Sequence, residues 1–317
     1  MSTSDVLSKF QTYSYKAASE ALGQNVAAFN EASNSAITLT SAANVGDYGN
    51  NAAFAAISDM IRRRDVYSNE AVESTSLEML NARSVKVAGG TSPVTFSPAH
   101  FAWIQQNPEE AGVVIGEQLA EGMLQDQLNA AVLAVKAAIS GNADAVHDGS
   151  AGKLSLEALL KGAAKMGDQA FSLAAWVIHS GPMHDLLASN VANTSNLFEF
   201  GTVRVVDDGF GRRLVMTDSP GLVDVEGGTP TYSTLGLVRG GVQVQDNGDL
   251  FSHIETQTGK ENLERVFQAE YSFNLGVKGA GYAGTHSPND ATLGSAASWE
   301  QIASSVKQGA GVVVTSK

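Results

Sequence analysis

Residues 107–139 read NPEEAGVVIGEQLAEGMLQDQLNAAVLAVKAAI, and this stretch decides the fold. Asn107 followed by Pro108 and two glutamates is typical of a helix start, with Asn as the capping residue and a glutamate closing a capping box. The segment Ser140-Gly141-Asn142 has the residue types that end a helix. The sequence therefore predicts one long helix between these two signals.

Apolar residues within this stretch repeat with helical spacing. Ile115, Leu119 and Met123 are four residues apart, and Leu128 continues the stripe. At 1.5 Å per residue, a helix of about 32 residues is roughly 48 Å long, whereas a compact domain of this chain length has a radius of gyration of about 20 Å. The helix would cross the whole molecule, which favours a flat, elongated subunit. Two shorter helices broken at Gly122 are the alternative.

A second long element is expected near the carboxyl end, where residues 263–277 alternate between two faces. Polar residues occupy one face, with Val266 as the exception. The other face carries Leu263, Arg265, Phe267, Ala269, Tyr271, Phe273, Leu275 and Val277. This period of two predicts one strand, or two joined strands, about 50 Å long with a single solvent-facing side. A long helix lying along a long strand indicates an α+β fold.

The residues before the long helix give weaker signals. Ser84–Val87 and Val94–Phe96 are β-type runs around a Gly-Gly turn, so they predict a projecting hairpin. Ala52–Arg64 has apolar residues at helical spacing and predicts a helix. Residues 1–48 are rich in Ser, Ala and Asn with weak periodicity, and a loose arm is expected there, with short helices as an open alternative around Val6–Leu22.

Shorter elements are predicted after the long helix. The expected helices are Leu156–Met166, capped by Ser155, Pro182–Ala188, and a short one carrying Trp299, Ile302 and Val306. The expected strands are Ser172–Ile178, Val203–Val206, Leu214–Thr217, Leu235–Val238, Val242–Gln245 and Gly309–Thr315.

Composition excludes several functions. The 317 residues suggest roughly two domains. A formal charge of −13 argues against a chain that wraps nucleic acid, and the absence of cysteine removes disulfides, iron–sulfur clusters and thiol nucleophiles. Charged residues are 17% of the chain, which leaves either an unusually neutral surface or one hidden against partners. The amino terminus has no signal-peptide pattern, so folding in a cytoplasm is expected.

Three short motifs resemble chemical sites without completing them. Gly279–Gly284 matches G-x-G-x-x-G, but a loop sequence follows where a helix would be required. His179–Asp185 places Ser180 beside His184, yet the flanking residues are not those of a nucleophile elbow. Asp246–Asp249 resembles part of a calcium loop but lacks the remaining ligands, so a hairpin turn is predicted. No catalytic, cofactor or metal site is predicted.

The order of these segments resembles the major capsid (coat) protein of tailed bacteriophages, the Hong-Kong-ninety-seven-type fold. Residues 175–187, AWVIHSGPMHDLL, resemble the entry to that family's axial domain. Residues 211–219 resemble its mid-domain strand, and residues 255–279 the return into its peripheral domain. Residues 287–291 with Trp299 are similar to the tail of one branch. The resemblance covers about residues 75–317.

The resemblance implies a role for each segment. The implied division is residues 1–76 as amino-terminal arm and helix, 77–106 as an extended hairpin loop over a neighbour, 107–169 with 250–285 as the peripheral domain with its spine helix, 170–249 as the axial domain, and 286–317 as the carboxyl-terminal tail. It also implies a shell of hexamers and pentamers, icosahedral or prolate, that encloses double-stranded DNA in the virion and is assembled in the bacterial cytoplasm. Scaffold, portal and decoration proteins would be partners, with no membrane and no sequence-specific nucleic acid.

We expect inter-subunit contacts from the hairpin and from the one basic triplet, whose arginines would pair with acidic neighbours. The residues are Val85, Val87, Val94, Phe96, Arg62, Arg63 and Arg64. Two alternative functions remain open at this stage. One is the shell protein of a bacterial nanocompartment, which shares the fold. The other is a serine hydrolase that uses Ser180 and His184.

Overall fold

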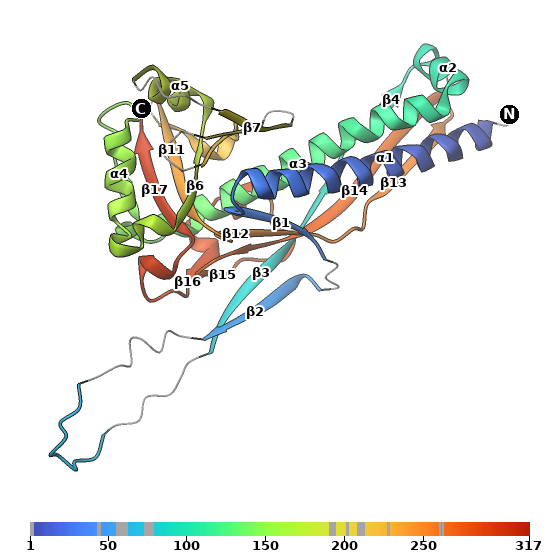
Figure 1. Cartoon of the computed structure of the whole chain (residues 1–317). Helices are drawn as coiled ribbons and strands as arrows, with labels where there is room; N and C mark the ends of the chain where they lie inside the picture. Colours follow the sequence, from blue (N-terminus) through green and yellow to red (C-terminus); the bar gives the residue numbers. More distant parts are fainter. Residues whose placement is uncertain are drawn as a thin grey trace.

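The computed structural model shows two lobes joined by one long helix, with a thin projection at one side (Figure 1). It describes residues 3–42, 46–54, 63–72, 79–189, 195–200, 203–207, 213–226, 229–259, 261 and 263–317. The helices are α1 (Thr3–Ala32), α2 (Pro98–Gln106), α3 (Pro108–Ser140), α4 (Leu156–Ala164), α5 (Ser180–Ser189) and α6 (Asp290–Leu293).

Three sheets are formed by the residues that the structure describes. The first runs β1 (Ile37–Ser41), β12 (Val242–Asp246), β14 (Glu264–Val277), β3 (Met79–Gly90) and β2 (Tyr48–Phe54), with β13 (Phe251–Gln257) and β4 (Val94–Phe96) also on β14. The second runs β5 (Val146–Asp148), β17 (Gly311–Ser316), β11 (Thr229–Val238), β6 (Leu173–Ile178), β9 (Arg213–Met216), β8 (Val203–Asp207) and β7 (Ser195–Phe200), with β10 (Val223–Glu226) on β11. The third pairs β15 (Ala280–Tyr282) with β16 (Trp299–Gln301).

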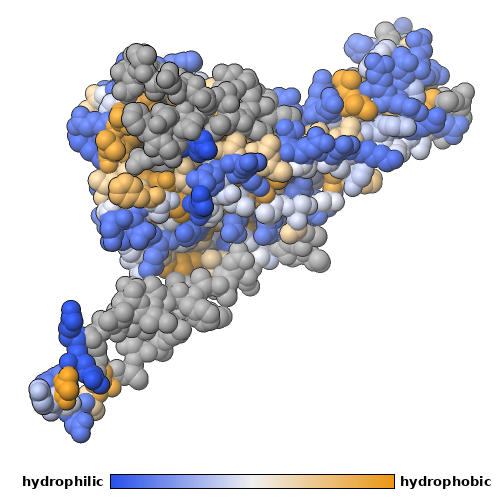
Figure 2. All heavy atoms as spheres, viewed as in Figure 1, coloured by the Kyte–Doolittle hydropathy of each residue, from blue (hydrophilic) through white to orange (hydrophobic). Residues whose placement is uncertain are grey.

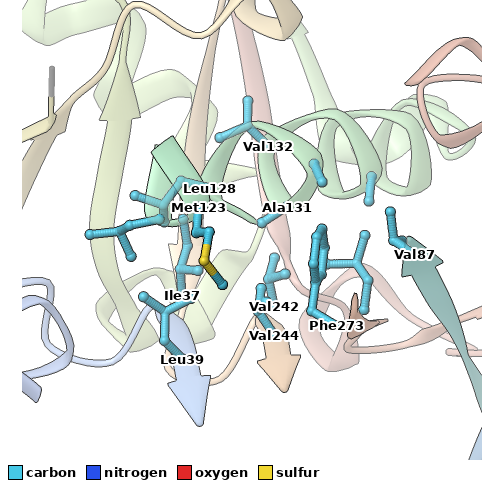
Figure 3. Packing of buried hydrophobic residues seen from close by; sticks show 14 of the residues in the cluster. Ile37, Leu39, Val87, Met123, Leu128, Ala131, Val132, Val242, Val244 and Phe273 are labelled. Carbon is cyan, nitrogen blue, oxygen red and sulfur yellow. The ribbon is translucent and has the colours of Figure 1, made fainter. Parts of the chain in front are cut away.

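The predicted long helix is confirmed as α3, which is 33 residues long and unbroken. The alternative of two helices is wrong, because α3 continues through Gly122. Asn107 does precede the first turn, but its side chain makes no capping hydrogen bond, so the predicted capping box is not formed. Towards the core, Met123 and Ala131 of α3 face β1, β12 and β14 (Figure 3).

The prediction of a loose amino-terminal arm is wrong, since residues 3–32 form helix α1 alongside α3. Its buried face includes Phe10, Ser14 and Phe29. Val6, Phe10, Ala18 and Leu22 form a buried stripe at helical spacing, which the polar Ser14 interrupts in the sequence. A Cβ atom on Gly116 of α3 would lie 2.5 Å from the carbonyl oxygen of Ser14, so the two backbones meet directly.

The long strand is confirmed as β14, but it does not have the single solvent-facing side that was predicted. Gln268 and Glu270 are exposed as expected, whereas Ser272 and Asn274 on the same side are buried. The β12–β13 loop covers them. Asn247 donates from Nδ2 to Ser272 Oγ at 2.8 Å, and Asn274 donates to Asn247 Oδ1 at 3.2 Å.

The predicted hairpin between Ser84–Val87 and Val94–Phe96 is wrong. Strands β3 and β4 do not pair with each other, because both pair with β14, one after the other along its length. The Gly-Gly sequence expected to turn instead continues β3 as far as Gly90. The predicted helix Ala52–Arg64 is also wrong, since its first residues belong to β2, and residues 55–62 lie outside the described part of the chain.

Most shorter elements are confirmed, among them α4, α5, β6, β8, β9, β11, β12 and β17. The predicted helix around Trp299 is wrong, because Trp299 begins strand β16 and donates from Nε1 to the Leu293 carbonyl oxygen at 2.9 Å. β12 belongs to the first sheet, and the carboxyl-terminal strand β17 lies inside the second, between β5 and β11.

One cation ties the spine helix to the second lobe. Lys136 of α3 lies with its Nζ 2.6 Å from Asp224 Oδ2 and 2.9 Å from the Gly221 carbonyl oxygen. A Cβ atom on Gly221 would lie 2.8 Å from Leu133 Cδ2, so the backbone there is held against α3. Both contacts fix the direction in which the second lobe leaves the helix.

The close contact of α1 with α3 yields a stability prediction. Gly116→Ala is expected to lower the free energy of unfolding by roughly 1–2 kcal/mol, because overpacking outweighs the gain in helix propensity. Gly122→Ala in the same helix is the matched control, since no atom lies within 4 Å of its added Cβ. That variant should gain up to about 1 kcal/mol. Denaturant unfolding measures both, and equal shifts for the two variants would contradict the packing argument.

Candidate assembly surfaces

The projection carries the most exposed apolar side chain in the described part of the chain, that of Tyr67. Strands β2 and β3 run antiparallel from the Tyr48–Val85 pair outwards to the Phe54–Met79 pair. Beyond them, Arg63–Val72 lies far from both lobes, and all of its residues are exposed (Figures 1 and 2). The side chains of Tyr67 and Val66 are 99% and 73% exposed. Apolar groups held this far from their own core are typical of a contact with another molecule.

The base of the projection is fixed to the body of the subunit. The Arg83 guanidinium lies 3.4 Å from the centre of the Tyr48 ring, a cation–π contact between β3 and β2. Ser84 Oγ donates to the Gly49 carbonyl oxygen at 3.2 Å. These cross-strand contacts give the projection a defined direction at the point where it leaves the sheet.

The predicted contact residues fall in three different environments. Val85 and Val87 are 0% and 7% exposed and contribute to the subunit's own core. Val94 is about half exposed on β4, while Phe96 packs edge-on against Phe10 with ring centroids 6.5 Å apart. Arg62 lies outside the described residues, whereas Arg63 and Arg64 are exposed near the outer end of the projection.

Sequence reasoning missed two apolar surfaces. Val66 and Tyr67 stand alone in a polar run, and that isolation was the available signal. On the second lobe, Leu156 and Leu160 lie one turn apart on the outer side of α4, and the Phe171 side chain that follows is 93% exposed. Apolar residues gather on the edge of the molecule where α4 lies (Figure 2). A helix-period pattern alone does not say which apolar residues stay uncovered.

The buried carboxylates serve structure rather than chemistry. Tyr271 of β14 donates from its hydroxyl to Asp126 Oδ2 of α3 at 2.8 Å. Burial raises the pKa of Asp126, the Tyr271 hydrogen bond lowers it in part, and the negative charge of Asp290 raises it further. Burial, followed by the charge of Asp126, also raises the pKa of Tyr271. This pair joins the long helix to the long strand.

The structure does not assemble a hydrolase site around Ser180 and His184. Within the described residues no hydrogen bond joins these two side chains, and Asp185 pairs instead with Lys153, Oδ1 to Nζ at 2.7 Å. His179 accepts from the Gly181 backbone N–H through Nδ1 at 3.2 Å. The cluster is therefore a strand-to-helix turn whose polar groups are used locally.

The other two motifs also take structural roles. Gly279–Gly284 contains the short strand β15, not a helix, so the phosphate-binding geometry of a dinucleotide site is not formed. Asp246 Oδ1 accepts from the Gly248 backbone N–H at 2.9 Å in the turn between β12 and β13. Over the described residues, no group of three His, Asp or Glu side chains could hold a metal ion. No described helix is long and apolar enough to cross a membrane.

A subunit with a long spine helix, two sheet lobes and a projecting strand pair belongs to a known class of fold. A solved capsid structure of Helicobacter pylori bacteriophage KHP30 is similar at a TM-score of 0.52 and 9% identity, covering 89% of this chain and 86% of that one. A structure from Mycobacterium phage Cain is similar at a TM-score of 0.50 and 12% identity, covering 90% of this chain and 88% of that one. The fold is therefore the Hong-Kong-ninety-seven-type fold of tailed-phage capsid proteins.

The family follows from the sequence. Residues 6–313 match the family model described as Gp13-like, major capsid protein 13-like, and the chain belongs to this family. The search of curated proteins found no match. The protein is thus a structural subunit of a phage capsid, where many copies form one shell, and its family and fold are not those of enzymes. The nanocompartment and hydrolase alternatives are not favoured.

The Asp126–Tyr271 pair yields a prediction on pH dependence. Because the folded state raises the pKa of Asp126 above its unfolded value, ionised Asp126 costs stability at neutral pH, and this cost disappears as the pH falls through the folded pKa. Asp126→Asn should therefore be more stable than wild type at neutral pH, and the difference should shrink in acid. Thermal unfolding across this range measures it. A difference that grows in acid would contradict the assignment.

Proposed function

We propose that this subunit forms the hexamers and pentamers of a closed shell, icosahedral or prolate, that encloses phage double-stranded DNA. The observation that carries the proposal beyond the family is the projection. At its outer end the Tyr67 side chain is almost fully exposed and that of Val66 is largely exposed. In a shell, a neighbouring copy would bury these side chains.

The segments take the roles that this assembly requires. The projection formed by β2 and β3, which includes part of residues 77–106, is the extended loop over a neighbour. The lobe around β14 and α3 is the peripheral domain, and the lobe around β6 and β11 is the axial domain near the capsomer centre. The residues Val94, Phe96, Arg63 and Arg64 contribute to the contacts between copies, with Arg62 beside them in the sequence.

The charge of the chain fits a container for DNA. A subunit of formal charge −13 repels nucleic acid on average, so packaged DNA would slide along the wall instead of adhering to it. Scaffold and portal proteins, and decoration proteins on the outside, are the further partners of such a shell. Assembly takes place in the cytoplasm of the host bacterium.

Negative-stain electron microscopy tests the proposal. The purified chain, alone or co-expressed with the scaffold of its phage, is expected to form closed shells or separate capsomers. A monodisperse monomer under every assembly condition would contradict it.

A substitution at the outer end of the projection separates assembly from folding. Tyr67→Ser should leave thermal unfolding of the isolated subunit unchanged, because the side chain has almost no contact within its own subunit. It should reduce the yield of particles at least about tenfold, since an aromatic anchor at an interface commonly contributes 2 kcal/mol or more. Sedimentation of particles measures the yield, and wild-type yield from Tyr67→Ser would contradict the role of this residue.

A further inference from the structure

A cavity of about 350 Å³ opens beside the first sheet, where β3, β12 and β14 approach the junction with the second lobe. Gly276 is one of its lining residues and carries no side chain. Gly276 of β14 is paired with Gln243 of β12, and a Cβ on Gly276 would lie 3.4 Å from Ser84 Cβ of β3. The missing side chain at Gly276 leaves room between its two neighbours.

Three cations line this cavity, one from each of three segments. Arg83 lies on β3, Arg239 follows β11, and Lys278 follows β14. The lining contains no carboxylate. Within the residues that the structure describes, none of the three takes part in an ion pair with Asp or Glu.

Two of the cations are held in place by uncharged partners. The Arg83 guanidinium stacks on the Tyr48 ring, and Arg239 donates from Nη2 to Asn34 Oδ1 at 2.6 Å. These contacts orient the side chains without neutralising them. A chain with 33 acidic and 20 basic residues has ample carboxylates to pair with three cations, yet none lines the cavity.

We propose that this cavity is a carboxylate-binding pocket that receives Asp or Glu side chains from a second copy of the chain. Like charges brought together at the rim repel one another, and an anion between them removes that repulsion. Each neighbouring copy carries a surplus of carboxylates, because its formal charge is −13. The proposal rests on the proposed assembly of many copies in one shell.

A carboxylate fits better than a nucleic-acid backbone. A DNA duplex presents phosphates in a continuous row and binds where cations form an extended patch or stripe. Here the cations converge on one concave site, and the chain as a whole repels a polyanion. A short acidic segment of a neighbour could enter the cavity while the rest of its surface stays outside.

The first experiment compares two double variants of equal charge. Arg239→Gln with Lys278→Gln removes two cations from the pocket, and Lys16→Gln with Lys165→Gln removes two exposed cations elsewhere. In sedimentation velocity at physiological salt, the pocket variant should require about tenfold more protein to assemble, while the control should match wild type. Equal assembly of pocket variant and control would overturn the proposal. Failure of wild type itself to assemble would count against the proposed function instead.

The second experiment needs no assembly. Fluorescence anisotropy compares the binding of a short poly-glutamate peptide and of a short DNA duplex to the soluble subunit. The peptide should bind wild type and lose about tenfold in affinity in the pocket double variant. Preferential binding of the duplex, lost in the same variant, would overturn the assignment of a carboxylate occupant. Absence of any peptide binding to wild type would also overturn it.

A third experiment builds a carboxylate into the pocket by substitution of one lining residue. Gly276→Asp should pair with the surrounding cations and abolish peptide binding, whereas Gly276→Asn fills almost the same volume without charge. We expect the Asp variant to bind the peptide at least about tenfold more weakly than the Asn variant. Equal affinities of the two variants would show that volume, not charge, controls the site and would overturn the proposal.

Discussion

Helix α3 lies along the first sheet and packs on its central strands through small and apolar side chains. Ala131 of α3 faces Phe273 of β14 and Val242 of β12 in the core (Figure 3). The hydroxyl of Tyr271 adds a hydrogen bond to Asp126 across the same contact. Because one element is a rod and the other a strand of similar reach, the contact sets the long dimension of the subunit. The second lobe then attaches at the carboxyl end of α3, where Lys136 meets Asp224.

Both partners of this contact could be predicted from the sequence, since each carries a regular period over many residues. The packing of helix α1 on α3 could not, because it depends on the close approach at Gly112 and Gly116, although α1 itself carries apolar residues at helical spacing. The strand partners of β3 and β4 could also not be predicted from the sequence. Their local sequence favours a hairpin, but both strands pair with β14, whose residues lie 169–190 positions further along the chain.

The assembly surfaces show the same division between local and non-local information. Val85 and Val87 have the alternation of a strand, and nothing local distinguishes a strand that is covered by its own subunit from one that is covered by a neighbour. Tyr67 could have been chosen from the sequence, because an aromatic residue between polar residues has no apolar face to join. The pocket around Gly276 could not, since its three cations come from segments that are brought together only by the sheet.

Charge connects these surfaces to the composition of the chain. Most ion pairs within the described residues lie at the exposed surface, where solvent screens them and each adds little to the stability of the subunit. The low content of charged residues therefore costs the fold little. It matters more between copies, because a surface with few charges can be buried at a low cost of desolvation. In the proposed assembly, the unpaired cations of the concave site and the surplus carboxylates of a neighbouring copy select the orientation of that neighbour by charge. Apolar contacts such as that of Tyr67 supply most of the binding energy.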